Sequence, residues 1–385
     1  MSYYYTLGEL PHKRHTQFRR PDGSLYHEEV MGIHGFAGIQ SILYHHHPPT
    51  RICRVLEELS VEVAYEATGR LRPRHLRSAH ISAGGDAVAG AVPLMGNQDV
   101  LISVARPDRP MDYWYKFAHG DFLYFIHEGT GTLETQFGTL RYRPGDYLVL
   151  PTGVIWRLLP DDGVAQRLLV VEAYGHIDPP QRYLNRYGQF LEHAPYCERD
   201  IRPPDQLVTK DEWGKFEVRV KARGVVSRFL YEHHPLDVVG WDGHLWPYAF
   251  NIADFEPITG RVHQPPPVHQ TFDGPGFVVC SFVPRLFDYH PQAIPAPYNH
   301  SNVDSDEVLY YVEGDFMSRK GIEQASLTVH PNGIPHGPHP GTYEGSIGKE
   351  KTEELAVMID TFRPLRLTEQ AHELEDEDYV YSWIG

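Results

Sequence analysis

Residues 122–129 read FLYFIHEG, and residues 307–314 read EVLYYVEG. Each segment is a run of apolar and aromatic residues that ends at a glycine, which is typical of a buried strand followed by a turn. Each is followed downstream by a second related segment, RPGDYLVLPTGVIW at 143–156 and SLTVHPNGIPH at 326–336. There a strand leads into Pro-x-Gly-x-x and then an aromatic residue or a histidine. The chain thus contains one β pattern twice, which predicts two similar β units.

The rest of the chain also favours short strands. Its 34 glycines and 32 prolines are spread among short apolar runs, which is typical of a mainly β fold with many turns. Further strands are expected at 140–142, 147–150, 167–173 and 276–283. Helical periodicity is weak, and only residues 180–192 suggest a short helix.

A connection between two domains is expected near residue 200. Residues 197–205 include prolines at 203 and 204 and contain no strand pattern. We therefore place an N-terminal domain at residues 1–205 and a C-terminal domain at residues 206–385. A length of 385 residues suits two domains, each with a core of its own.

Composition restricts the partners and the compartment. The chain has 35 Lys and Arg against 51 Asp and Glu, a net charge of −16, which argues against nucleic acid or an anionic membrane as a partner. The three cysteines are too far apart for a disulfide framework, which favours a reducing compartment. No stretch has the length and apolarity of a membrane span. We expect a cytoplasmic protein.

The second copy of the repeat carries three residues that suit a metal. Glu307 begins its first strand, His300 precedes this strand, and His336 follows the Pro-x-Gly turn. Alternating side chains allow all three to face one interior. Two imidazoles and one carboxylate leave coordination positions open, which suits Fe(II) with an organic ligand and dioxygen. Zinc is the competing metal, although the paired histidines of a zinc-protease helix are absent. Asp306 is an alternative carboxylate, but only Glu307 keeps the six-residue gap to Gly314.

The first copy provides an internal contrast. Aligned position by position, the residues that replace the histidines and the glutamate are Tyr115, Phe122 and Trp156. These side chains are not plausible metal ligands, so the first unit is expected to be structural and free of metal.

Two motifs give the first resemblance to known proteins. His300-x-Asn302-x4-Glu307-x6-Gly314 and Pro331-x-Gly333-x-x-His336 resemble the two motifs of the cupin superfamily, in which small β-barrels carry metal ligands on their inner faces. The resemblance implies a bicupin, a fold of two such barrels.

A wider resemblance covers most of the chain. It is similar to the homogentisate 1,2-dioxygenase family, in a compact bacterial form. The segments that carry this similarity are residues 237–255 (DVVGWDGHLWPYAFNIADF), 282–285 (FVPR), 296–302 (APYNHSN), 334–338 (IPHGP) and 376–385 (DEDYVYSWIG).

The resemblance implies an activity. It implies an Fe(II) enzyme that uses dioxygen to open the ring of homogentisate, a small aromatic acid, to maleylacetoacetate in tyrosine and phenylalanine catabolism. It also implies a homo-oligomer, a trimer or a hexamer. A dioxygenase for a related hydroquinone such as gentisate and a non-catalytic metal-binding bicupin are the alternatives.

The resemblance also assigns roles to single residues. His300, Glu307 and His336 match the iron ligands. His330 matches a second active-site histidine, which lies near the iron without binding it. The catalytic acid or base falls within residues 261–270, where His263 is the first choice and His269 the alternative.

The substrate's acetate group requires a donor. Tyr298 and Arg319 match family residues in that role, and Lys320 lies beside Arg319. Phe316 is a departure, because the family carries a tyrosine there that approaches the ring. This loss of a hydroxyl affects the expected substrate and leaves the iron site unchanged.

The histidines at positions 45–47 form a dense run. Three consecutive side chains on a strand cannot all face one ion. A surface or subunit-contact loop is the favoured interpretation.

Overall fold

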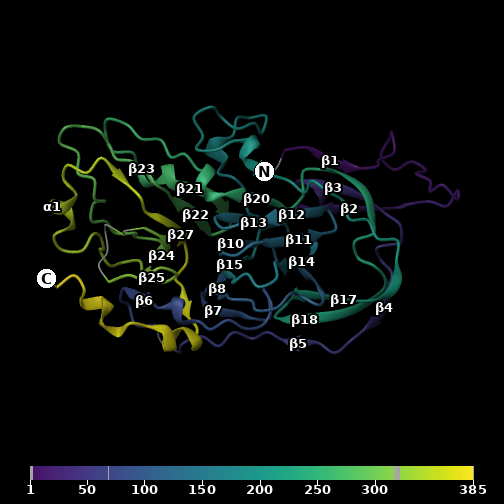
Figure 1. The fold of residues 1–385 in the computed structure, drawn as a ribbon, viewed down its shortest axis with the longest axis horizontal. Coiled ribbons are helices and arrows are strands. Elements are labelled where there is room, and N and C mark those ends of the chain that lie inside the picture. Colours follow the sequence, from purple (N-terminus) through teal and green to yellow (C-terminus); the bar gives the residue numbers. More distant parts are fainter. Residues whose placement is uncertain (1–2, 68, 315, 317–320, 385) are drawn as a thin grey trace.

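A computed structural model describes residues 3–67, 69–314, 316 and 321–384. The fold is mainly β, as expected, and its strands form several sheets in which the pairs are antiparallel except for β9 (Trp114–Phe117) with β17 (Trp213–Ala222) (Figure 1). In the described residues the α-helical content is α1 (Thr342–Ser346), and the expected helix at 180–192 is reduced to a single 3-10 turn at Gln181–Tyr183. None of the described helices has the length and apolarity needed to cross a membrane.

The first unit contains two eight-stranded sheets. One has the order β16 (Ile201–Arg202), β20 (Tyr248–Asn251), β13 (Asp146–Leu150), β10 (Phe122–Glu128), β15 (Arg167–Ala173), β8 (Val100–Ala105), β7 (Ala91–Gly96) and β28 (Arg366–Leu367). The other has the order β12 (Gly138–Tyr142), β11 (Gly131–Thr135), β14 (Ile155–Pro160), β9 (Trp114–Phe117), β17 (Trp213–Ala222), β18 (Val225–His233) and β4 (Ile52–Val55), with β5 (Leu59–Ser60) also on β18. Phe122 of the first sheet packs on Trp156 of the second, so the two sheets face each other across the core.

The second unit is built on a six-stranded sheet. Its order is β21 (Gln270–Gly274), β22 (Phe277–Phe282), β27 (Leu355–Thr361), β24 (Asp306–Glu313), β25 (Leu327–His330) and β6 (Arg74–Leu76). A two-stranded sheet, β23 (Arg285–Leu286) with β26 (Lys351–Thr352), lies beside it. This unit occupies the left of Figure 1, away from the sheet of β1 (Tyr5–Gly8), β19 (Val238–Gly243), β3 (Gln40–His45) and β2 (His27–Gly32).

The strand pairing reproduces the sequence repeat. β10 pairs with β13 and β15, and β24 pairs with β25 and β27 in the same way. The glycines that end β10 and β24, Gly129 and Gly314, have φ angles of +107° and +109°. A side chain is strained in this conformation, so both turns require glycine. The two copies therefore share both their strand pairing and the conformation of this turn.

The sheets do not divide at residue 205. β17 and β20 lie beyond this point, yet β17 pairs with β9 and β20 pairs with β13 of the first unit. Conversely β6, near the N-terminus, pairs with β25 of the second unit. The pairing thus places residues 213–251 with the first repeat, and the chain crosses between the units more than once.

The expected surface loop for the histidine run at 45–47 was wrong, because His45 and His47 are buried and His46 is partly buried, while a subunit contact stays a prediction. His45 ends β3, and its side chain is buried between the carboxylates of Asp237 (2.7 Å) and Glu29 (3.1 Å). His47 is buried as well and stacks on the ring of His233. The run could not reveal this, because its carboxylate partners are distant in the sequence.

His45 makes the stability of the fold depend on pH. Burial alone would lower its pKa, but the hydrogen bonds to Asp237 and Glu29 raise it to about 9 from an unfolded value of 6.5. The folded state therefore holds the proton more tightly. This stabilisation is complete below pH 6.5 and is lost as the pH rises through 9. The difference in pKa corresponds to about 3 kcal/mol.

The His45→Gln variant tests this linkage. We expect its free energy of unfolding to fall below that of the unchanged protein by about 3 kcal/mol more at pH 6.5 than at pH 9.5. Urea titrations of both proteins at the two pH values measure this difference. Equal losses at both pH values would contradict the assigned ion pairs.

Candidate metal centre

Three side chains from distant parts of the chain converge in the second unit. His300 and His336 lie opposite each other as an isolated antiparallel bridge, with backbone hydrogen bonds of 2.8 and 2.9 Å in the two directions. Glu307 stands near the start of β24. Its Oε2 lies 3.5 Å from Nε2 of His300 and 3.4 Å from Nε2 of His336. One ligand atom of each residue lies within 4.8 Å of the other two.

The donor atoms of this group fit a metal ion. The carbonyl oxygen of Tyr298, which can only accept, lies 3.1 Å from Nδ1 of His300, so Nδ1 carries the proton and Nε2 presents a lone pair. Nε2 of His336 is buried and has no hydrogen-bond partner among the described residues. A buried nitrogen in that state is costly unless a ligand satisfies it. No fourth His, Cys, Asp or Glu of the described chain joins the group.

Asp306, the alternative carboxylate, points away from the group. Its two oxygens accept backbone hydrogen bonds from Asn332 (2.8 Å) and Leu365 (2.7 Å). Adjacent strand residues face opposite sides, so only one of the two carboxylates can reach the histidines. That residue is Glu307.

A further histidine, His330, forms a hydrogen bond with Glu307. Its Nδ1 donates to Oε1 of Glu307 at 2.8 Å, and its Nε2 lies 3.1 Å from the hydroxyl of Tyr379. The ring is fully buried and stacks on His336. His330 thus touches a candidate ligand without belonging to the group itself. Burial alone would raise the pKa of Glu307, but hydrogen bonds from His300 and His330 lower it well below its ordinary value.

The Tyr379 hydroxyl is expected to support metal binding through this chain. In the Tyr379→Phe variant His330 loses the partner of its Nε2, so the orientation of Glu307 is less well fixed. We expect a metal dissociation constant higher by roughly 10-fold, measured by competition with a chelator. The control is Tyr381→Phe in the same C-terminal turn, where the side chain is 62% exposed. Equal affinities in the two variants would contradict the role of Tyr379.

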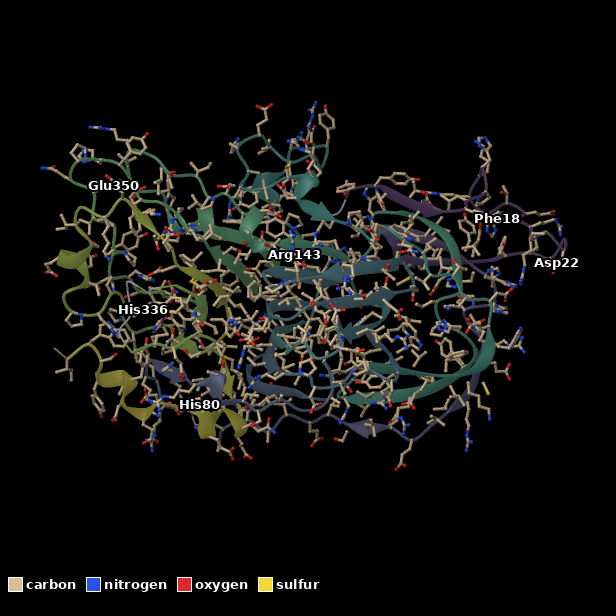
Figure 2. All side chains as sticks on the ribbon, in the orientation of Figure 1. Phe18, Asp22, His80, Arg143, His336 and Glu350 are labelled. Carbon is tan, nitrogen blue, oxygen red and sulfur yellow. The ribbon has the colours of Figure 1, made fainter. Side chains whose placement is uncertain are left out.

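A cavity of about 190 Å³ opens beside the group. His300 and Glu307 form part of its wall, and Figure 2 places His336 inside the second unit. Its walls are largely apolar, with Phe282, Leu309 and Met358 among them. An apolar cavity of about 150 Å³ accepts benzene, so this one has room for a single aromatic ring with short substituents.

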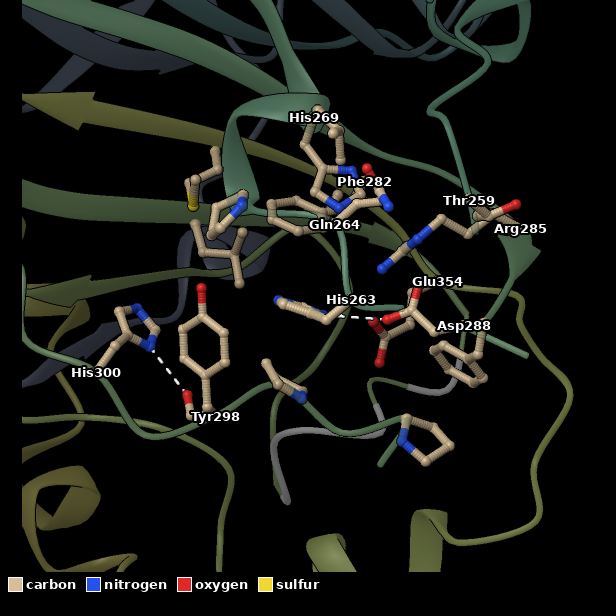
Figure 3. A pocket seen from close by; sticks show the side chains of 18 of the residues that line it. Thr259, His263, Gln264, His269, Phe282, Arg285, Asp288, Tyr298, His300 and Glu354 are labelled. Atoms are coloured by element: carbon tan, nitrogen blue, oxygen red, sulfur yellow. Dashed lines mark hydrogen bonds and ion pairs between the residues drawn. The ribbon is translucent and has the colours of Figure 1, made fainter. Parts of the chain in front are cut away.

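The cavity also contains both candidate acid/base histidines (Figure 3). Nδ1 of His263 lies 3.1 Å from Oδ2 of Asp288, and its ring meets Tyr298 edge to face. His269 is buried against Phe282, and burial lowers its pKa to about 3. A group with this pKa does not exchange a proton near neutral pH, so the geometry favours His263.

The structure brings most of the expected substrate contacts to the cavity. Tyr298 lies between His263 and His300, with ring contacts to both. Phe316 lines the same space and packs on Tyr311. Arg319, together with Lys320, lies outside the described residues.

The matching place in the first unit is filled by aromatic rings. Tyr115 pairs with Trp156 as His300 pairs with His336, and Phe122 occupies the position of Glu307. The rings of Tyr115 and Phe122 both pack on Trp156, with centroid distances of 5.3 and 5.5 Å. These buried side chains extend the hydrophobic core, and the alignment of the two repeats is confirmed residue by residue.

Two residues at the site were missed by sequence reasoning. Asp360 lies opposite Glu307 on β27, and burial together with the Glu307 charge raises its pKa. Its counterpart in the first unit is Glu172, opposite Phe122, so aligning the repeats one strand further would have found it. Arg285 lines the cavity and stands in a segment noted only for its similarity to a family.

The chain is similar in sequence to known proteins. Residues 76–252 match the model of the homogentisate 1,2-dioxygenase N-terminal domain. A protein of Saccharolobus solfataricus described as a "putative dioxygenase" is 39% identical over 386 residues, which cover 100% of this chain and 99% of the relative. The chain belongs to the homogentisate 1,2-dioxygenase family. The family match ends one residue after β20.

More distant members of the homogentisate 1,2-dioxygenase family are longer. The homogentisate 1,2-dioxygenase of Rhodopseudomonas palustris BisB5 is 27% identical over 291 residues, or 71% of this chain and 63% of the relative. That of Emericella nidulans is 26% identical over 64% of this chain and 56% of its own length. The chain thus spans less than two thirds of these relatives.

Among solved structures, a cupin 2 conserved barrel domain protein from Leptotrichia buccalis is similar in part. It aligns with 79% of this chain and 98% of its own, at 11% identity and a TM-score of 0.37.

Proposed function

We propose that the protein is a non-haem Fe(II) dioxygenase that opens the ring of homogentisate to maleylacetoacetate, in tyrosine and phenylalanine catabolism. One observation carries the proposal. Two imidazoles and one carboxylate meet beside a cavity with room for a single aromatic ring, and two of the three, His300 and Glu307, line its wall. Three protein donors leave positions for a chelating substrate and for dioxygen. The family relationship supports iron over zinc.

His300, Glu307 and His336 would hold the iron. When bound, the iron would lower the pKa of a ring hydroxyl and supply electrons to dioxygen. His330 keeps Glu307 in place, and the bridge between His300 and His336 fixes the spacing of the two imidazoles.

The remaining residues act on the substrate. His263 would take the proton of a ring hydroxyl and return it later, and the contact with Asp288 would orient its imidazole. The apolar walls align the ring and exclude water. Tyr298 can donate a hydrogen bond to an oxygen of the substrate.

Oxygen consumption tests the proposal. Protein loaded anaerobically with Fe(II) is mixed with oxygenated buffer and with homogentisate, gentisate or hydroquinone in turn. We expect one dioxygen to be consumed per homogentisate, together with the absorbance of a ring-opened product. Absence of uptake with homogentisate would overturn this substrate, and uptake with gentisate alone would identify the related dioxygenase. If the protein binds no iron, the proposed enzymatic function is overturned.

A further inference from the structure

Arg285 places a positive charge inside the cavity. It lies on the short strand β23, directly after Pro284, and pairs with Thr352 of β26. Its side chain lines the same cavity as His300 and Glu307. Figure 3 shows His300 at the left side of this cavity and Arg285 at the right, with Tyr298 and His263 between them. A cation thus stands away from the candidate metal ligands.

This guanidinium is poorly compensated by the protein. It is partly buried and forms no ion pair with a described residue, and its one hydrogen bond is a long contact of 3.5 Å to the carbonyl oxygen of Val283. The nearby carboxylate of Asp288 is engaged by His263. Burial lowers the pKa of Arg285 despite the attraction of Glu354 and Asp288. A buried guanidinium in this state is stabilised by an anionic ligand.

The candidate metal ligands and Arg285 lie on opposite sides of the cavity. Apart from Tyr298 and His263, its lining includes the apolar side chains of Phe282 and Met358. A ligand that fills it therefore needs an oxygen for the metal at one end, a ring in the middle and an anion at the other end. A carboxylate bonded directly to the ring beside a hydroxyl would instead lie at the metal.

We propose that Arg285 binds the substrate's carboxylate and makes the site selective for aryl acids whose carboxylate is separated from the ring by at least one carbon. The inference rests on the proposed function and deepens it. The planar guanidinium offers two parallel N–H donors to a carboxylate, which a lysine cannot match. Arg285 is thus a specificity residue that discriminates arylacetates from ring carboxylates.

A binding experiment without metal tests Arg285 independently of turnover. Phenylacetate, phenylacetamide and benzoate are titrated calorimetrically into the metal-free protein and into the variants Arg285→Gln and Arg285→Lys. We expect Arg285→Gln to weaken phenylacetate binding by roughly 10- to 100-fold and to leave phenylacetamide unchanged. The phenylacetate affinity of Arg285→Lys should lie between that of Arg285→Gln and that of the unchanged protein. The benzoate affinity should change little in both variants. Unchanged phenylacetamide binding also shows that the cavity of each variant is intact.

Arg261 provides a matched control. It is exposed and lines a neighbouring recess rather than this cavity. Arg261→Gln removes a positive charge from this recess and should change the affinity for phenylacetate by less than about 3-fold. The proposal is overturned if Arg285→Gln binds phenylacetate as tightly as the unchanged protein, or if Arg261→Gln loses as much affinity.

A turnover experiment connects this residue to the proposed reaction. With Fe(II) loaded, Arg285→Gln should raise the KM for homogentisate roughly 10- to 100-fold and leave kcat nearly unchanged, because the contact is the same in the ground and transition states. If the unchanged protein oxidises none of the hydroquinones, the proposed function fails, while phenylacetate binding still decides the role of Arg285. An unchanged KM in an active Arg285→Gln variant would contradict the proposed role of Arg285 in binding the carboxylate.

Discussion

The His336→Ala variant is expected to bind Fe(II) more weakly by at least about 100-fold and to show no measurable oxygen uptake. The substitution removes one of three donors, and the two that remain belong to His300 and Glu307. The fold should survive, because His336 is held to His300 by backbone hydrogen bonds that alanine keeps. Iron analysis after anaerobic loading and an oxygen electrode measure the two effects.

His80→Ala is the matched control. It makes the same chemical change at a side chain that is 62% exposed and lies at the lower edge of the molecule (Figure 2). It should keep both iron and activity, and the thermal unfolding of all three proteins should be similar. Stoichiometric iron in His336→Ala would rule out the proposed ligand set.

The His263→Gln variant should lose a factor of roughly 100 to 10,000 in kcat and keep its iron. Glutamine preserves a polar side chain of similar reach, but it cannot exchange a proton. Oxygen uptake under saturating substrate gives kcat, and metal analysis separates this effect from loss of the ligand group. Asp288→Asn should have a smaller effect in the same direction, because it only weakens the orientation of the imidazole.

His269→Gln distinguishes the two histidines of the cavity. Burial lowers the pKa of His269 to about 3, so it stays neutral in the working range and should be dispensable for proton transfer. We expect kcat to change by less than about 10-fold. A loss of activity in His269→Gln but not in His263→Gln would reverse the assignment.

The metal group was predictable because the sequence contains the surrounding strand pattern twice and has metal-binding residue types in one copy only. In the first copy the three positions are Tyr115, Phe122 and Trp156, and the strand pairing of the two units is the same at each of them. Alternation along a strand also decided between Glu307 and Asp306. Local rules were sufficient here, since the spacing of the residues within each hairpin sets their register.

Partners that are distant in the sequence were not predictable. Tyr379 reaches His330 from the last turn of the chain, and His45 finds its carboxylates at positions 29 and 237. The expected division at residue 205 followed a proline-rich stretch, whereas β17 and β20 return to the first unit after it. Such contacts depend on how the strands are arranged in space, which hydrophobic patterns alone do not specify.

The pairing of β6 with β25 has a consequence for biosynthesis. β6 ends at Leu76 and β25 begins at its partner Leu327, which lies 251 positions later in the sequence. During translation β6 emerges early and waits with an unpaired edge until β25 follows, and Tyr379 arrives later still. The unit that carries the candidate metal centre can thus be completed only after β25 and Tyr379 have left the ribosome, and contacts of such long sequence separation favour slow folding.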